Sequence, residues 1–284
     1  MGPLILALAV ILCSSLQSSA TSPQTGESRV ALAAVTDAAN HPFVDVGVDD
    51  FVIQEAGVAR EVLSVRPADY PIIVLLDTGD DPRGDFPLMR RAVEHFINRI
   101  GQRPIALGTF GTQPAMLTSF DDERETVLAR LEGLAAEEGT PSLLLQGAAL
   151  AGETMKSTGS LFSAIVAVSA TPEDASRSTA AEASAAIVDS GAALHVIANR
   201  PGAPGSGGLI GGQTLRALAG QTHGEFTTIY SAASYQAALD RLADRLTSEM
   251  MIEYIVPVGS KPRDVRVGIR IVGARVRGLG VAPR

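Results

Sequence analysis

Cysteine, tryptophan and long apolar runs are scarce in this chain of 284 residues. Cys13 is the sole cysteine, tryptophan is absent, and aromatic residues make up 4% of the sequence. One cysteine can form neither an intramolecular disulfide nor a thiolate metal site. No apolar run approaches the roughly 20 residues that a membrane-spanning helix needs. The composition therefore predicts a protein that does not span a membrane and does not depend on disulfides or thiolate chemistry.

Charge is absent from the first twenty residues, which contain the apolar run Leu4–Leu12 and end in Ser18-Ser19-Ala20. An apolar run followed by small residues is typical of a secretory signal peptide. We therefore expect a signal peptide over residues 1–20, a polar linker over 21–28, and export to the periplasm or the medium. Lipid modification of Cys13 is the alternative, although Leu12 stands where lipoprotein signals carry a small residue.

Basic residues are concentrated at the C-terminal end of a chain whose net charge is −8. Residues 261–284 carry seven basic side chains against Asp264 alone. Aromatic side chains, on which nucleic-acid bases would stack, are missing between these arginines. The pattern favours a strand with a solvated basic face over a nucleic-acid interface.

Strands and helices alternate through the middle of the chain. The continuous apolar run Ile72–Leu76 is typical of a strand that is covered on both faces. We expect further strands over 105–110, 161–169, 194–198 and 225–229, and helices over 88–100, 123–134, 143–155, 175–190, 214–219 and 235–250. This alternation predicts an α/β fold over 70–249 with a doubly wound, mostly parallel, six-stranded sheet.

Short strands alone flank this block. They are expected over 30–36, 44–48, 51–54 and 60–65 before it, and over 252–258, 265–271 and 274–278 after it. Residues 265–271 alternate apolar and polar side chains, which indicates a half-buried strand, and we expect the other two C-terminal strands to pair with it. Neither flank is long enough to bury its own apolar face. We therefore expect segments 29–69 and 250–284 to form one small β-domain.

The loop after the first buried strand, Asp77-Thr78-Gly79-Asp80-Asp81, resembles that of the von Willebrand factor type A (vWA) family. Within that family the chain is most similar to a secreted bacterial vWA-related group. Other stretches share the resemblance and follow in the family's order: 49–57, Gly139-Thr140-Pro141, 218–224, and Tyr254 with the strand at 265–271. The resemblance implies a Rossmann-like domain that binds a macromolecular partner, in many members through a metal-ion-dependent adhesion site.

This resemblance implies a metal site that is incomplete. Asp77 and Thr140 stand where the family has its aspartate and threonine, but Gly79 and Asp81 replace the two serines of Asp-x-Ser-x-Ser. Ala170 or Thr171 stands where the family has its second aspartate, and the nearest acids are Glu173 and Asp174. Mg²⁺ requires a nearly octahedral set of oxygen ligands. We therefore expect no stable Mg²⁺ site, and at most weak Ca²⁺ binding by Asp77, Asp81 and Thr140.

Enzyme signatures are missing from the sequence. The glycine-rich run Gly202–Gly212 fits neither a phosphate-binding loop nor a dinucleotide fingerprint, and Ser206 lacks the context of a catalytic serine. Four histidines show no metal-ligand spacing: His41, His95, His195 and His223. His195 lies in an apolar strand and is expected in the core. We predict no enzymatic activity and no cofactor.

Three functions remain open. The preferred one is an exported interaction module that binds a protein partner through the carboxyl edge of the sheet, with Asp77, Asp80, Asp81, Thr140 and His223 at that edge. The second is an adhesion domain that depends on Mg²⁺ or Ca²⁺. The third is a periplasmic hydrolase or small-molecule binder that uses the same edge.

Overall fold

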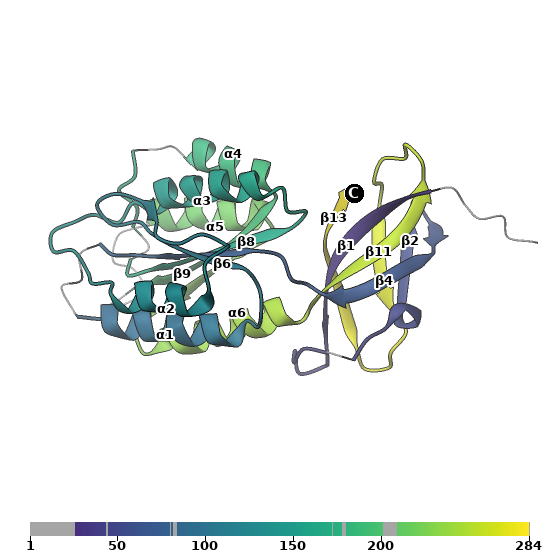
Figure 1. Cartoon of the computed structure of the whole chain (residues 1–284), viewed down its shortest axis with the longest axis horizontal. Helices are drawn as coiled ribbons and strands as arrows, with labels where there is room; N and C mark the ends of the chain where they lie inside the picture. The colour runs from purple at the N-terminus through teal and green to yellow at the C-terminus, as the bar shows by residue number, and fades with distance from the viewer. Residues whose placement is uncertain are drawn as a thin grey trace, which may run out of the picture.

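The computed structural model describes residues 26–43, 45–79, 81, 84–171, 173–177, 180–200 and 209–283, which form two domains (Figure 1). The expected signal peptide and the start of the linker lie outside these ranges. The last three linker residues, 26–28, belong to the first strand instead. No helix in the described ranges is long and apolar enough to cross a membrane.

The first domain, called the α/β domain here, contains the predicted six-stranded sheet. Its strand order is β10-β9-β8-β5-β6-β7, and all neighbours are parallel except β6 and β7. The strands are β5 (Ile72–Leu76), β6 (Ile105–Thr109), β7 (Ala115–Met116), β8 (Ser163–Ser169), β9 (Ala192–Asn199) and β10 (Glu225–Ile229). Every side chain of β5 is buried. The interior position predicted for Ile72–Leu76 is confirmed, whereas the two-residue edge strand β7 was not expected.

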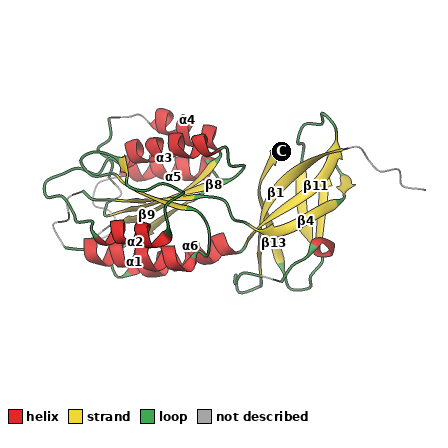
Figure 2. Cartoon of the chain, in the orientation of Figure 1, coloured by secondary structure: helices red, strands yellow, loops and turns green. Residues whose placement is uncertain are grey.

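Helices cover both faces of this sheet (Figure 2). One face packs against α1 (Phe86–Arg99), α2 (Arg124–Glu132) and α6 (Ser234–Thr247), and the other against α3 (Leu144–Thr158), α4 (Ala180–Ser190) and α5 (Leu209–Gln221). Strand β5 contributes Ile72, Val74 and Leu76 to the first core, and Ile73 and Leu75 to the second. The alternation of side chains along one strand therefore supplies both hydrophobic cores.

The second domain, called the β-domain here, is a sandwich of two antiparallel sheets. The larger sheet has the order β13-β1-β11-β4, and the smaller has the order β12-β2-β3. Their strands are β1 (Gly26–Thr36), β2 (Phe51–Glu55), β3 (Val58–Arg60), β4 (Val62–Pro67), β11 (Glu249–Pro257), β12 (Val265–Ile269) and β13 (Arg275–Pro283). Apolar residues from both sheets form a separate core between them. The predicted fold class, including a small β-domain built from the two ends of the chain, is confirmed.

Two details of the β-domain differ from expectation. Residues 45–47 are not in a strand, and Val48–Asp50 form a short 3-10 helix where the strand 44–48 was expected. Strand β12 pairs with β2, not with β11 or β13 as predicted. Alternation shows which face of a strand is buried but does not identify its partner, and this strand pairs with an N-terminal segment far away in the sequence.

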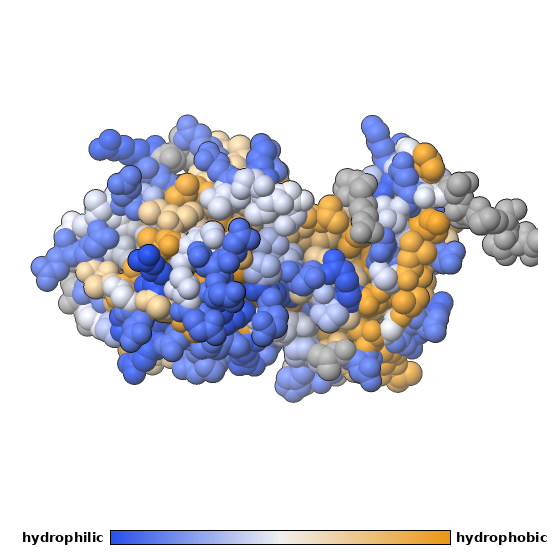
Figure 3. Space-filling view, in the orientation of Figure 1, coloured by the Kyte–Doolittle hydropathy of each residue, from blue (hydrophilic) through white to orange (hydrophobic). Residues whose placement is uncertain are grey.

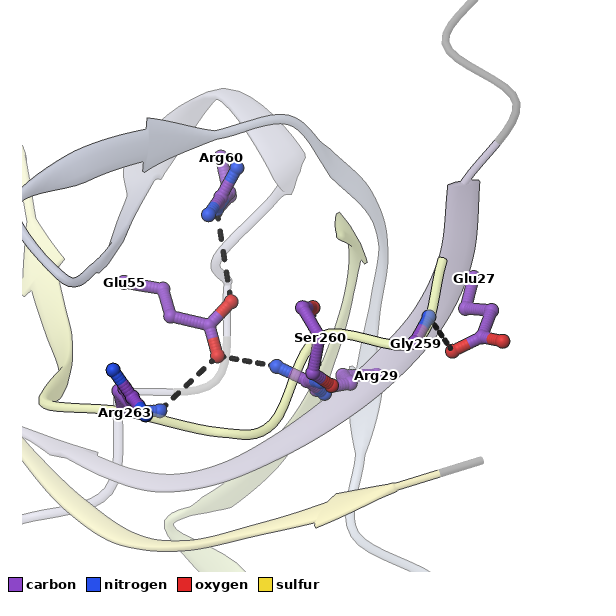
Figure 4. A network of polar contacts seen from close by, with 7 residues as sticks. All are labelled: Glu27, Arg29, Glu55, Arg60, Gly259, Ser260 and Arg263. Carbon is purple, nitrogen blue, oxygen red and sulfur yellow. Dashed lines mark hydrogen bonds and ion pairs between the residues drawn. The ribbon is translucent and has the colours of Figure 1, made fainter. Parts of the chain in front are cut away.

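A buried ionic network joins the two sheets of the sandwich (Figure 4). The Glu55 carboxylate receives a hydrogen bond from the Arg29 guanidinium, lies 3.6 Å from Arg60 Nε, and accepts a hydrogen bond from the Arg263 backbone N–H at 3.4 Å. Glu55 and Arg29 are 2% and 3% exposed, so neither charge can be hydrated from outside. Removal of Glu55 would leave Arg29 as a buried charge without its carboxylate partner, which typically costs about 3–5 kcal/mol.

A second buried polar cluster lies where the chain passes between the domains. Tyr70 follows β4 and its hydroxyl donates to Glu249, the first residue of β11. The Arg103 guanidinium lies 4.5 Å from the centre of the Tyr70 ring and donates to the Leu246 carbonyl at 2.5 Å. Burial raises the pKa of both Tyr70 and Glu249. Polar groups thus connect the amino edge of the six-stranded sheet with the β-domain.

Candidate functional site

Asp77 lies directly after β5, at the carboxyl edge of the sheet, and is 1% exposed. Its Oδ1 accepts a hydrogen bond from Gly79 N at 2.9 Å. Its Oδ2 accepts from Ser142 Oγ at 3.0 Å, Ser169 Oγ at 2.7 Å and Ala170 N at 3.0 Å. Both carboxylate oxygens are therefore engaged by donors from three different loops.

Two opposing effects act on the Asp77 carboxyl. Burial raises its pKa, because the charged form loses hydration, while the four donors lower it, the Ser169 hydroxyl most strongly. The balance leaves the pKa above its ordinary value. Because Oδ2 accepts three hydrogen bonds, a cation could approach Asp77 only through Oδ1, which accepts one. The geometry is that of a structural acceptor that ties loops together.

The Gly139–Pro141 loop does lie beside Asp77, as expected, but the threonine hydroxyl is used elsewhere. Thr140 Oγ1 donates to the Glu137 carbonyl within its own loop at 2.8 Å. A Cβ atom placed on Gly79 would lie 3.0 Å from Asp77 Oδ1 and 3.3 Å from the Thr140 carbonyl oxygen. Position 79 is therefore closely packed against both neighbours, and a side chain there would require them to shift.

Asp81 is held by the first turn of α1. Its Oδ2 accepts a hydrogen bond from Phe86 N at 2.6 Å, which satisfies one of the free amide groups at the start of that helix. Asp80 lies outside the described residues. Within the described ranges, no group of three or more His, Cys, Asp or Glu side chains is placed to hold a metal ion. Both Asp77 oxygens, Asp81 Oδ2 and Thr140 Oγ1 are thus hydrogen-bonded within the protein.

His223 lies at the opposite edge of the sheet, which corrects its expected position. It lies two residues before the start of β10, and β10 runs parallel to β9, so this residue is at the amino edge. Its backbone is in the left-handed region, with φ of 61°. There it borders a pocket together with residues of the β-domain such as Leu279 and Val281. His223 therefore cannot share a binding surface with Asp77.

The other features singled out for enzymatic chemistry are also dispersed. His195 is 2% exposed in β9, whereas His41 is exposed beside Asp37, and His95 lies 3.2 Å from Asp240 on the α1 side. Ser206 lies outside the described residues. The expected glycine-rich loop 202–212 is shorter than predicted, because α5 already begins at Leu209. His41 and His95 lie apart from the other histidines, whereas His195 and His223 both line the pocket between the amino edge and the β-domain.

Three residues at the carboxyl edge escaped the sequence analysis. Ser142 and Ser169 supply the hydroxyl donors to Asp77, and Glu137 accepts hydrogen bonds from Thr78 Oγ1 at 3.3 Å and from Thr112 Oγ1. Signals were available for both serines, since Ser169 ends the expected strand 161–169 and Ser142 directly follows Gly139-Thr140-Pro141. Glu137, Glu138 and Glu173 are exposed and give the rim of the edge an acidic character.

The chain as a whole can be compared with known proteins. No family model matches the sequence, and no curated protein matches it. A solved von Willebrand factor type A protein from Catenulispora acidiphila is 12% identical, with a TM-score of 0.52 over 92% of this chain and 74% of that one. Proximal thread matrix protein 1 from the mussel byssus, "with zinc occupied MIDAS motif", is 12% identical, with a TM-score of 0.54 over 70% of this chain. The match spans 48% of the length of the mussel protein. The chain therefore has the vWA fold.

Proposed function

We propose that this chain is an exported, non-enzymatic interaction module that binds a protein partner at the carboxyl edge of its sheet without a metal ion. The observation that carries the proposal is the Asp77 carboxylate, which is 1% exposed and accepts four hydrogen bonds from the protein. Export is proposed from the apolar segment and small residues before Thr21.

The fold supports an interaction module in general, because the solved structures it resembles include a protein whose metal-ion-dependent adhesion site is occupied by zinc. In this chain the equivalent edge is buried and hydrogen-bonded at its centre and exposed at its rim. Glu137 and Glu138 lie in one exposed loop, and Glu173 follows β8. An acidic rim favours encounter with a basic protein surface, since complementary charge increases the rate and specificity of association.

The absence of a metal requirement can be tested by calorimetric titration with Mg²⁺ and Ca²⁺. We expect no Mg²⁺ binding, because the Asp77 oxygens already accept hydrogen bonds and Mg²⁺ tolerates irregular geometry poorly. The matched variants are Asp77→Asn and Asp264→Asn, the latter on an exposed turn of the β-domain. Tight Mg²⁺ binding that is lost in Asp77→Asn but kept in Asp264→Asn would restore the metal-dependent adhesion mechanism.

The docking surface can be tested by placing a photo-crosslinking residue at one exposed position at a time in the native host. Glu138 lies on the proposed surface, whereas Val272 is 98% exposed on the β-domain. We expect a discrete cross-linked protein from position 138, in the presence of EDTA as well, and none from position 272. Equal cross-linking from both positions would contradict partner binding at the carboxyl edge. Loss of the product with EDTA would contradict binding without a metal ion.

A further inference from the structure

A cleft of about 640 Å³ lies between α6 and the β-domain, on the side of the molecule away from Asp77. Helix α6 runs into β11 at the junction of the two domains, as Figure 1 shows, and the space-filling view shows a constriction between the domains (Figure 3). Four arginines line the cleft: Arg241 and Arg245 from α6, and Arg275 and Arg277 from β13. The last two belong to the basic C-terminal segment, for which the sequence suggested only a solvated face.

Each pair of arginines presents its side chains in one direction. Arg241 and Arg245 are four residues apart on a helix, and Arg275 and Arg277 are two residues apart on a strand, so the members of each pair share a face. Asp244 is the one acidic residue that lines the cleft, and it bonds to Arg99 at 2.5 Å. Four guanidinium groups thus border this space with little compensating negative charge.

Ion pairing within the protein leaves most of this charge unused. Arg245 pairs with Glu225 at 2.9 Å and donates to the His223 carbonyl at 3.1 Å, but its Nε is buried without a hydrogen-bond partner. Among the described residues, no ion pair involves Arg241, Arg275 or Arg277. The guanidinium groups of Arg241, Arg275 and Arg277, and the Nε–H group of Arg245, therefore remain available to bind an anion.

Crowding of like charges also affects the pKa of one of the four arginines. The pKa of Arg277 is lowered, first by burial and then by the neighbouring Arg245, although Glu249 and Glu225 act in the opposite direction. Like charges brought together in this way repel, and a bound anion would relieve the repulsion. The arrangement is unfavourable for the protein alone and favourable for a complex with an anion.

We propose that this cleft binds a soluble organic phosphate through Arg241, Arg245, Arg275 and Arg277. Guanidinium groups donate paired hydrogen bonds to phosphate oxygens, and a tetrahedral oxyanion accepts such bonds from a helix on one side and a strand on the other. The volume is in the range of small-molecule sites and exceeds that of a single phosphate group. Ala34 and Val276 supply apolar wall for the remainder of the ligand.

The test is calorimetric titration of the whole chain with inorganic pyrophosphate as the probe, at low ionic strength. We expect saturable binding with a stoichiometry of one. Binding should be at least tenfold weaker in Arg241→Gln/Arg277→Gln, because charge-assisted hydrogen bonds are lost. The control is Lys261→Gln/Arg266→Gln, which removes the same charge from exposed positions outside the cleft. Arg241→Gln alone, at an exposed position, keeps the test valid if the double variant does not fold.

Three results would overturn the proposal. One is the absence of pyrophosphate binding to the unmodified chain. Another is an equal loss of affinity in the cleft variant and in the control variant, which would indicate attraction by overall charge. The third is binding to vesicles containing phosphatidylglycerol without binding to pyrophosphate, which would assign the arginines to a membrane surface.

Discussion

The two edges of the six-stranded sheet differ in how the buried polar groups at the ends of β5 and β8 are bonded. At the carboxyl edge, Asp77 accepts four hydrogen bonds, and the hydroxyls of Ser142 and Ser169 both donate to it. At the amino edge, Ser163 Oγ and His195 Nδ1 are buried without a hydrogen-bond partner. Both groups line the pocket that this edge forms with the β-domain.

The central carboxylate of the edge with the family's motif therefore has its hydrogen bonds in place, although Asn199 Oδ1, at the end of β9 on the same edge, is buried without a partner. Buried polar groups without partners are uncommon in folded proteins, because each loses its hydration without compensation. The completed hydrogen bonds around Asp77 stabilise the loops of the carboxyl edge. The unpaired Ser163 Oγ and His195 Nδ1, and the arginines beyond them, lie between the two domains, where a ligand would contact both.

The largest effect that should separate the two edges is the loss of stability in Asp77→Ala. The substitution leaves two hydroxyls and two backbone N–H groups without their acceptor in a buried site. We expect the free energy of unfolding to fall by about 4 kcal/mol, as when a buried polar network is broken. Urea denaturation followed by circular dichroism measures this quantity.

The matched control for this substitution is Ser142→Ala, which removes one donor and leaves the carboxylate with three. It should cost about 1 kcal/mol, the usual net value of one hydrogen bond. A loss below about 1 kcal/mol in Asp77→Ala would mean that the network contributes little. In that case the carboxylate would be available to a cation after all.

Much of the fold was predictable because its central strands are apolar throughout. The expected bounds of β5 and β10 agree with the structure, and the helix ends differ by only a few residues in most cases. The two-residue strand β7 offers no periodicity to detect. The pairing of β12 with β2 joins segments about two hundred residues apart, and nothing local in either strand specifies the other.

The candidate site was predictable to a smaller extent. The position of Asp77 beside the Gly139–Pro141 loop followed from the resemblance, but its hydrogen bonds to Ser142 and Ser169 did not. His223 was assigned to the wrong edge, although a loop that precedes a parallel strand lies at the amino edge. The arginine cleft requires knowledge of how α6 and β13 pack, which no pattern within either segment contains.

The second-largest effect expected is a loss of stability in acid that is caused by His195. Burial, with the nearby charges of Arg245 and Arg277, lowers the pKa of His195 from 6.5 to about 3. Between these two pH values the His195 imidazole is protonated in the unfolded chain and neutral in the folded chain. Stability is therefore lost as the pH falls from 6.5 toward 3. Between pH 7 and pH 5 this contribution removes about 2 kcal/mol.

The variant His195→Leu should lack this contribution, so its stability should decline less than that of the unmodified chain over the same interval. Asp77 and Glu249, with raised pKa values, titrate in the opposite sense: their favourable contribution is present at low pH and lost as the pH rises. Comparing the two chains at each pH cancels these carboxyl groups. Parallel pH profiles for the two chains would show that His195 stays hydrated or paired in solution.

The smallest effect is expected for two serine substitutions at the two ends of one strand. They give the most direct comparison of the two edges, because both serines belong to the same strand. Ser169 ends β8 at the carboxyl edge and donates to Asp77 at 2.7 Å, while Ser163 begins β8 at the amino edge with a buried hydroxyl that has no partner. Ser169→Ala should lower the free energy of unfolding by about 1 kcal/mol or more, since a buried carboxylate loses a donor. Ser163→Ala should leave it unchanged or raise it by up to about 1 kcal/mol, since burial of an unpaired hydroxyl is itself unfavourable. Both changes remove one oxygen atom from a fully buried strand, so packing differs little between them. If Ser163→Ala proved as costly as Ser169→Ala, its hydroxyl would be bonded in solution, and the contrast between the edges would not hold.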